Sequence, residues 1–265
     1  RDVLGSRGLG DVYKRQKTMS AVSKVKVPLT TIPRFQKEAA EIALQMSQFS
    51  VDELERLLRV NAKIAVENYK RYQAFHAETT PELPALLAYT GIVFKRLNPK
   101  DFSAEDFGYA QEHLRLTSFC YGLLRPLDVI RAYRLEGDVV LPELGNQTLF
   151  SYWRSRLTDT FIEDIRSAGG ILCNLASDEM KSLFDWKRVE SEVRVVTPEF
   201  HVWKNGKLAT IVVYTKMSRG EMTRFILKNK IGNPEELKGF SWEGFEFDES
   251  LSDERKLVFI NGMGE

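Results

Sequence analysis

Cysteine and histidine are scarce in this chain, which has two cysteines and three histidines among 265 residues. Cys120 and Cys173 lie in separate apolar runs, so the sequence predicts neither a disulfide framework nor a Cys-x-x-Cys site. A reactive thiol needs an exposed, electropositive setting, and core packing is therefore the better interpretation of both residues. The histidines are isolated and lack the spacing of metal ligands. We expect no structural metal and no bound cofactor.

Long apolar runs and a charge excess are also missing. No stretch approaches the roughly 18 to 20 apolar residues that span a bilayer, and nothing resembles a signal peptide, so we expect a cytoplasmic protein without a membrane partner. The 38 basic and 37 acidic residues give a net charge of +1, which favours no particular partner. Charge is unevenly distributed, however. Residues 56–72 are mainly basic and residues 243–254 mainly acidic, so a local basic surface is expected.

The first sixteen residues, 1–16, read as translated sequencing-adapter sequence rather than as a natural segment. No linker, low-complexity run or internal repeat divides the remainder. Its length is enough to bury a substantial core. The sequence therefore predicts one compact domain over residues 17–265.

The pattern of apolar residues predicts an α+β fold with a mixed sheet and a mainly helical N-terminal half. Capping signals at Ser50 and Ser103 start two of the expected helices, and Thr80-Pro81-Glu82 is predicted to open another. A long helix is expected at 149–167. Strands are expected at 170–175, 193–198, 245–247 and 257–260, and a hairpin around Asn205-Gly206 with residues 211–214 in its second arm.

One segment, residues 110–136, places three arginines among aromatic and aliphatic residues: Arg125, Arg131 and Arg134. Buried charge is costly unless something pairs with it. The proline after Arg125 favours an extended backbone that exposes the arginine side chain to an anion. The alternative is that the arginines pair internally with acids such as Asp128 and Glu136 and only stabilise a loop.

A second cationic segment is interpreted as a strand-to-helix junction. Ser218 and Glu221 form a capping-box pattern for a helix that ends at Asn229. Helix N-termini favour anions, so basic residues beside one suggest a phosphate ligand, with Gly220 allowing close approach to the backbone. The candidate residues are Lys216, Arg219, Gly220 and Arg224. The alternative is an ordinary surface helix with solvated cations.

Two helices at 50–75 are joined by a short connection that resembles a helix-hairpin-helix, an element that binds the DNA backbone without reading sequence. Asn61 stands where that element usually has glycine, and asparagine tolerates a left-handed backbone. Lys63 follows it. An ordinary helical hairpin explains the residues equally well.

Carboxylates for proton transfer are available at Glu136 and Glu179, with His113 as a further candidate. Glu179 lies in the block NLASDEM, residues 174–180, where an acid at a helix start also has a structural explanation. No residue identifies a nucleophile or a leaving group.

Four ordered blocks resemble the YaaA family of bacterial peroxide stress proteins. They are the end of an N-terminal SPAKTL at Lys17-Thr18, the combination AQEHLR with YGLLRPLD and YRLE, NLASDEM, and VVYTKMSRGEMTRFI. The resemblance implies DNA binding in a positively charged cleft. It also implies a short apolar strand ahead of Lys17, which we expect this chain to lack.

The sequence departs from the family pattern at two places. Residues 91–94 read GIVF where relatives carry a GDVY-like tetrad, and residues 216–219 read KMSR in place of KKAR. An acid, a phenol and one cation of the family pattern are therefore missing from this chain.

The basic segments predict binding of duplex or distorted DNA through backbone phosphates, and the resemblance implies a peroxide-stress protein that helps to limit iron-dependent oxidative DNA damage. The rival is an enzyme acting on a nucleotide or nucleic-acid phosphate, which predicts a narrow pocket where carboxylates converge. The DNA-binding hypothesis predicts a broad groove and strongly salt-dependent affinity. A third hypothesis, an interaction module without nucleic acid, predicts arginines occupied by internal ion pairs.

Overall fold

The computed structural model of the chain describes residues 19–204 and 206–262. The predicted tail, residues 1–16, lies outside this part. The helices are α2 (Gln36–Met46), α3 (Val51–Leu58), α4 (Ala62–Ala74), α5 (Ala85–Ala88), α6 (Ile92–Leu97), α7 (Ala104–His113), α8 (Leu149–Ser167), α9 (Asp178–Lys181), α10 (Trp186–Glu192) and α11 (Val212–Asn229). The strands are β1 (Glu82–Pro84), β2 (Leu116–Ser118), β3 (Gly122–Leu124), β4 (Val129–Arg131), β5 (Val140–Leu141), β6 (Gln147–Thr148), β7 (Ile171–Cys173), β8 (Arg194–Lys204), β9 (Lys207–Ala209), β10 (Phe245–Asp248) and β11 (Lys256–Asn261).

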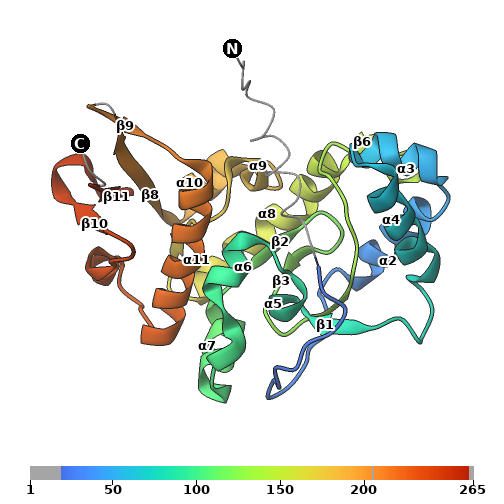
Figure 1. Ribbon diagram of the computed structural model, residues 1–265, viewed down its shortest axis with the longest axis horizontal. Helices are drawn as coiled ribbons and strands as arrows, with labels where there is room; N and C mark the ends of the chain where they lie inside the picture. The colour runs from blue at the N-terminus through green and yellow to red at the C-terminus, as the bar shows by residue number, and fades with distance from the viewer. Residues whose placement is uncertain (1–18, 205, 263–265) are drawn as a thin grey trace, which may run out of the picture.

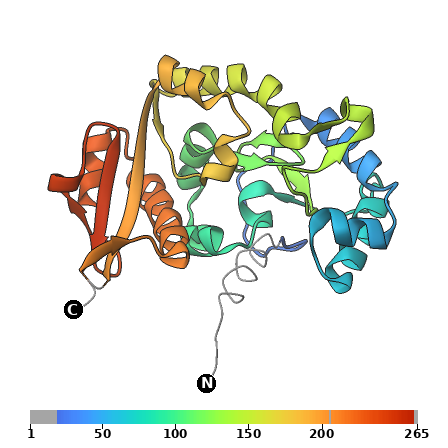
Figure 2. The same cartoon turned by 90° about the horizontal axis from the view of Figure 1, so that it is seen from above.

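The sheet and the N-terminal helices lie at opposite ends of the described part of the chain. Strands β8, β10 and β11 lie at one end and helices α3 and α4 at the other, with α6, α7 and α11 between them (Figures 1 and 2).

The largest sheet is mixed, which confirms the α+β prediction. Its strand order is β10-β11-β8-β7, and β9 also pairs with β8. Strands β7 and β11 run parallel to β8, whereas β9 and β10 are antiparallel to their partners. The hairpin expected around Asn205-Gly206 is formed by β8 and β9, although Asn205 itself lies outside the described residues.

Local capping chemistry determines several helix starts as the sequence indicated. Ser50 and Ser103 each form a complete capping box, with Glu53 and Asp106 respectively. The side-chain oxygen of each serine accepts a backbone N–H that no helical carbonyl can satisfy. Helix α8 spans residues 149–167 as predicted, with Thr148 as its cap.

Two predicted elements are wrong. Glu82 opens no helix, because residues 82–84 form β1, which pairs with β4. Residues 211–214 are not a strand arm, because β9 ends at Ala209 and α11 begins at Val212. The run Ile211-Val212-Val213 favours a strand by local propensity, but packing of the later turns of α11 continues the helix back through these residues.

Helix α11 links two separate hydrophobic cores. Met222 packs with Phe200 and Phe259 of the C-terminal sheet, and Leu227 belongs to a small core with α6 and α7 residues. The main core lies on the other side of α6 and α7 and is built from α2, α3, α4 and α8 with β2 and β3. The position of α11 therefore decides how the sheet end meets the helical end.

The closest approach of α11 to α6 is made at Gly220. A Cβ atom there would overlap the carbonyl oxygen of Val93 and lie 2.8 Å from Cβ of Arg96. Glycine is required because backbone carbonyl atoms cannot move away as a flexible side chain can.

We expect Gly220→Ala to destabilise the protein by about 1–3 kcal/mol, even though alanine favours helix, because the added methyl group overlaps α6. Chemical denaturation measures the change. Gly108→Ala in α7 is the matched control: nothing lies within 4 Å of a Cβ at that position. It is expected to be neutral or stabilising by up to about 1 kcal/mol. Equal effects of the two substitutions would contradict the packing argument.

Candidate phosphate-binding cavity

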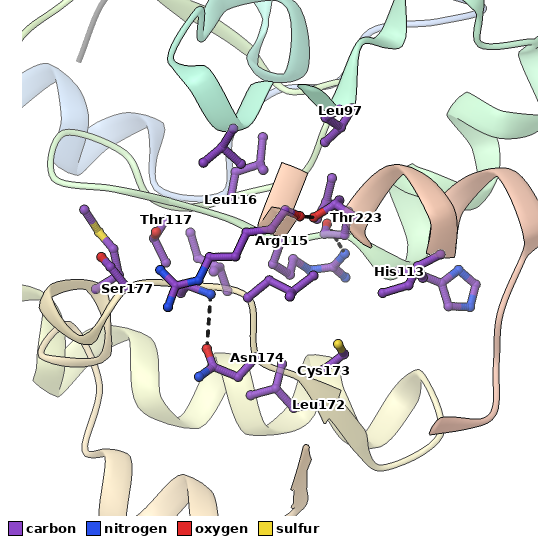
Figure 3. A pocket seen from close by; sticks show the side chains of 18 of the residues that line it. Leu97, His113, Arg115, Leu116, Thr117, Leu172, Cys173, Asn174, Ser177 and Thr223 are labelled. Atoms are coloured by element: carbon purple, nitrogen blue, oxygen red, sulfur yellow. Dashed lines mark hydrogen bonds between the residues drawn. The ribbon is translucent and has the colours of Figure 1, made fainter. Parts of the chain in front are cut away.

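A cavity of about 540 Å³ lies where the sheet end meets the helical end. Its lining comes from α6, α7, β2, α8, β7, α9 and α11 and from the loops between them. Leu116 and Thr117 of β2 lie on one side of this space, and Leu172, Cys173 and Asn174 lie on the other (Figure 3). Segments far apart in sequence thus form one site.

Three of the nine residues predicted to bind phosphate line this cavity: Arg134, Lys216 and Arg219. The Arg134 side chain is only 5% exposed, and its guanidinium lies 3.6 Å from the Glu136 carboxylate. Lining residues with a positive charge are Arg115, Arg134, Lys181, Lys216 and Arg219; those with a negative charge are Glu112, Asp164 and Glu179. The described lining is therefore net positive, which suits an anionic ligand.

The three residues proposed for proton transfer do not converge. Glu179 and His113 line the cavity. Glu136 is not among the lining residues, but its carboxylate lies beside Arg134, which is. The exposed His113 ring stacks on Tyr109 at 4.0 Å, and its Nδ1 lies 3.0 Å from the Tyr109 carbonyl oxygen. This geometry places His113 at the rim.

Two other predicted arginines, Arg125 and Arg131, are each paired with a carboxylate. The Arg125 guanidinium lies 3.0 Å from Asp128, whose side chain is 1% exposed. Arg131 donates to Glu82 at 2.9 Å and to the Phe75 carbonyl oxygen. These internal pairs match the structural alternative for both arginines.

Arg224 has a similar structural environment. Its guanidinium pairs with Asp101 at 2.5 Å and also donates to the carbonyl oxygens of Leu97 and Asn98 at the end of α6. The hydrogen bond from Arg224 lowers the pKa of Asp101. Arg224 thus fastens α11 to α6.

The predicted strand-to-helix junction at residues 216–221 is corrected by the structure. Helix α11 begins at Val212, so these residues lie within the helix and Ser218 is not its cap. The backbone N–H of Gly220 is therefore part of a helix interior, and its missing side chain serves packing against Val93. Glu221 pairs with Arg96 at 3.7 Å, and burial raises the pKa of this carboxyl.

The two helices expected at 50–75 are α3 and α4, and none of their residues lines the cavity. Asn61 caps α4 by accepting the Ile64 N–H at 3.0 Å, and its φ of −78° is not left-handed. The left-handed residue of the connection is Arg59, with φ 50°. Lys63 is exposed. Figures 1 and 2 show α3 and α4 at the opposite end from the C-terminal sheet.

Sequence reasoning missed a chain of hydroxyl groups on the cavity wall. The Tyr133 hydroxyl lies 2.8 Å from that of Tyr89 and 2.6 Å from Ser118 Oγ. Burial raises the pKa of Tyr89 to about 12, so it remains a protonated donor at neutral pH. These residues have no recognisable spacing, because the fold alone brings positions 89, 118 and 133 together.

Sequence reasoning also missed Arg115. Its Nε donates to Asp164 of α8 at 2.7 Å, and its Nη1 donates to the carbonyl oxygens of Glu112 and Leu114. Its position directly within the block AQEHLRL was the available signal.

Over 19–204 and 206–262, no cluster of three or more His, Cys, Asp or Glu side chains is arranged to hold a metal ion. No helix in the same ranges combines the length and the apolar character needed to cross a membrane.

The fold and the cavity define an α+β protein with a cationic cavity at the junction of a mixed sheet and a helical region. A sequence model of the family described as "Peroxide stress protein YaaA" matches residues 14–251, so the chain belongs to that family. A UPF0246 protein of Bacteroides thetaiotaomicron is 99% identical over 249 residues, which are 94% of this chain and 97% of the relative. A UPF0246 protein of Crocosphaera subtropica is 37% identical over 94% of this chain and 98% of that relative.

We expect Arg125→Met to destabilise the protein by about 1–2 kcal/mol, because the buried Asp128 carboxylate loses its cationic partner. Thermal and urea unfolding measure the change. Lys63→Met, at an exposed position, is the control and is expected to lie within about 0.5 kcal/mol of the parent. An unchanged free energy of unfolding in Arg125→Met would show that the buried Asp128 carboxylate does not depend on this pair.

Burial raises the pKa of the Cys173 thiol to about 12 and also raises the pKa of Cys120. At neutral pH both are expected to be thiols, which react slowly with peroxide and iodoacetamide. Mass spectrometry of alkylation in native and denatured protein measures this. Fast modification of Cys173 in the native state would contradict the packing interpretation and support a redox role.

Proposed function

We propose that the protein acts in the response to peroxide by binding DNA through its backbone phosphates, with little sequence preference. In this proposal Arg134, Lys216 and Arg219 hold phosphate at the cavity. In the same proposal the protein helps to limit iron-dependent oxidative DNA damage. Family membership supports the peroxide-stress role.

The single observation that carries the proposal is the convergence of cations from distant segments. Arg134 follows β4, whereas Lys216 and Arg219 lie one turn apart on α11. A spacing of three residues puts the last two on one helix face. The uncharged donors Thr117 and Ser177 also line the cavity. Cations combined with neutral donors are the groups that contact phosphate and sugar in protein–DNA interfaces.

The helical hairpin is a second contact surface in the same proposal. Lys63 is exposed at the start of α4, and Asn61 is the N-cap residue of that helix. Such helix starts receive phosphate oxygens. Because no residue of α3 or α4 lines the cavity, an extended ligand is needed to reach both.

The second candidate is an enzyme that acts on a nucleotide or nucleic-acid phosphate. The cavity volume of about 540 Å³ favours it, since this lies within the roughly 300–1,000 Å³ of small-molecule sites. Glu179 lines the cavity with Glu112 and Asp164, and it is the one of these carboxylates that the sequence proposed for proton transfer.

We expect a fluorescent DNA duplex, with or without a bulge, to bind with an affinity that falls steeply as salt rises. Lys216→Ala/Arg219→Ala is expected to weaken binding about tenfold or more and to reduce the slope of log affinity against log salt by about 1.8, since each lost phosphate contact contributes about 0.9. Fluorescence anisotropy measures both, and circular dichroism verifies the fold.

The matched control is Lys204→Ala/Lys207→Ala, which removes the same charge from exposed positions at the β8–β9 hairpin. It is expected to change the slope little. An equal effect of both double variants would show that binding depends on overall charge and not on the cavity. Absence of binding by the folded parent at low salt would refute the DNA proposal and leave the enzyme, to be sought by nucleotide screening.

A further inference from the structure

The hydroxyl chain of Ser118, Tyr133 and Tyr89 on the cavity wall has a direction that the backbone determines. Ser118 Oγ accepts the N–H of Tyr121 at 2.8 Å and the N–H of Cys120 at 3.2 Å. A serine oxygen has two lone pairs and one proton. Because both lone pairs are occupied, the Ser118 hydroxyl must donate, and its partner is the Tyr133 hydroxyl at 2.6 Å.

This direction continues along the chain to Tyr89. The Tyr133 oxygen accepts from Ser118, so the Tyr133 proton is donated to the Tyr89 oxygen at 2.8 Å. Burial raises the pKa of Tyr89, and the hydrogen bond from Tyr133 opposes this rise, as a donor to a phenolic oxygen does. Within residues 19–204 and 206–262, the Tyr89 hydroxyl has no hydrogen bond to a carbonyl or carboxylate oxygen. Its own proton therefore remains to be donated.

The Tyr89 donor lies beside apolar side chains of the cavity. The ring of Tyr89 packs on that of Phe94, with the ring centroids 5.1 Å apart, and both residues line the cavity with Leu116. A polar group in apolar surroundings costs free energy unless it is hydrogen-bonded. A ligand that brings an acceptor atom to this position forms the missing bond, and an otherwise equal ligand without the acceptor is disfavoured.

One short helix lies between this donor and the basic residues of α11. Phe94 of α6 packs on Tyr89, whereas the carbonyl oxygen of Val93 faces Gly220, which directly follows Arg219. The axes of packed helices are about 8–10 Å apart. Tyr89 and Arg219 also line the same cavity. A single ligand with an anionic end and an acceptor-bearing ring can therefore contact both.

We propose that the cavity takes one nucleotide, with a phosphate at Lys216 and Arg219 and an acceptor atom of the base at the Tyr89 hydroxyl. The phosphate contact rests on the proposed function, and the base is a second recognised group. Thymine offers such an acceptor in its keto oxygen. The nucleotide is either free or an unpaired nucleotide of DNA, because a paired base leaves the stack only at an energetic cost.

The experiment compares Tyr89→Phe, which removes only the donor, with Tyr109→Phe as the matched control. Tyr109 lines the same cavity, but its hydroxyl already donates to the Ile231 carbonyl oxygen at 3.0 Å. Circular dichroism and the melting temperature verify both folds.

Three fluorescent DNA duplexes are compared by anisotropy: a fully paired duplex, one with a single bulged thymine, and one whose bulge carries difluorotoluene. Difluorotoluene has the shape of thymine without its strong acceptor atoms. Calorimetric titration with thymidine 5′-monophosphate tests the free nucleotide.

We expect the parent protein to bind the thymine bulge about threefold to tenfold more tightly than the difluorotoluene bulge, which corresponds to one hydrogen bond. Tyr89→Phe is expected to abolish this difference and Tyr109→Phe to keep it. Binding of the fully paired duplex is expected to be the same in all three proteins. The comparison of the two bulges on the parent needs no variant, so it decides the result even if Tyr89→Phe fails to fold.

Equal binding of the two bulges by the parent, with no effect of Tyr89→Phe on thymidine monophosphate, would overturn the proposal. Binding of the paired duplex in that case would leave the DNA function standing. Binding of thymidine monophosphate that Tyr89→Phe weakens, without binding of any duplex, would support the nucleotide site and refute the DNA function. A thymine preference that persists in Tyr89→Phe would overturn the assignment to Tyr89.

Discussion

The contact between α11 and α6 is the constraint on which the rest of the structure depends. Gly220 allows the helix backbone to approach the Val93 carbonyl oxygen, and Arg224 then reaches Asp101 and the carbonyl oxygens at the end of α6. Lys228 adds an ion pair with the largely buried Asp106, 2.8 Å away. Because α11 also packs Met222 into the sheet core, this contact sets the distance between sheet and helices. The cavity lies in the space between the sheet and the helices.

The arginines of the chain divide according to the cost of burying charge. Arg125, Arg131 and Arg224 each lie beside a carboxylate and join segments distant in the fold or stabilise a turn. Removing one partner of such a pair costs more than the pair itself contributes, since the remaining charge stays desolvated. Arg134 also lies beside a carboxylate, that of Glu136, but it lines the cavity together with Lys216 and Arg219. Position on the cavity lining therefore separates the ligand-binding candidates from Arg125, Arg131 and Arg224.

The cavity has two chemically different parts. Apolar residues of β2, β7 and α8 form one part, and the three predicted phosphate-binding residues, which come from α11 and from the chain after β4, form the other. One of the two departures from the family pattern falls here, because Ile92 and Phe94 line the cavity, whereas Met217 and Ser218 are not among its lining residues.

Local chemistry by itself determined the helix starts at Ser50 and Ser103, the long helix at 149–167, the β8–β9 pairing and the α+β class, because caps, periodicity and turn residues act within a few positions. The ordered blocks of sequence also determined the family. Tertiary structure alone decided that residues 211–214 begin a helix, that Gly220 serves packing, and which arginines face a cavity. Those outcomes depend on partners such as Val93, Asp101 and Asp128. The sequence separation between a residue and such a partner does not reveal the contact, since packing against distant segments overrides local propensity.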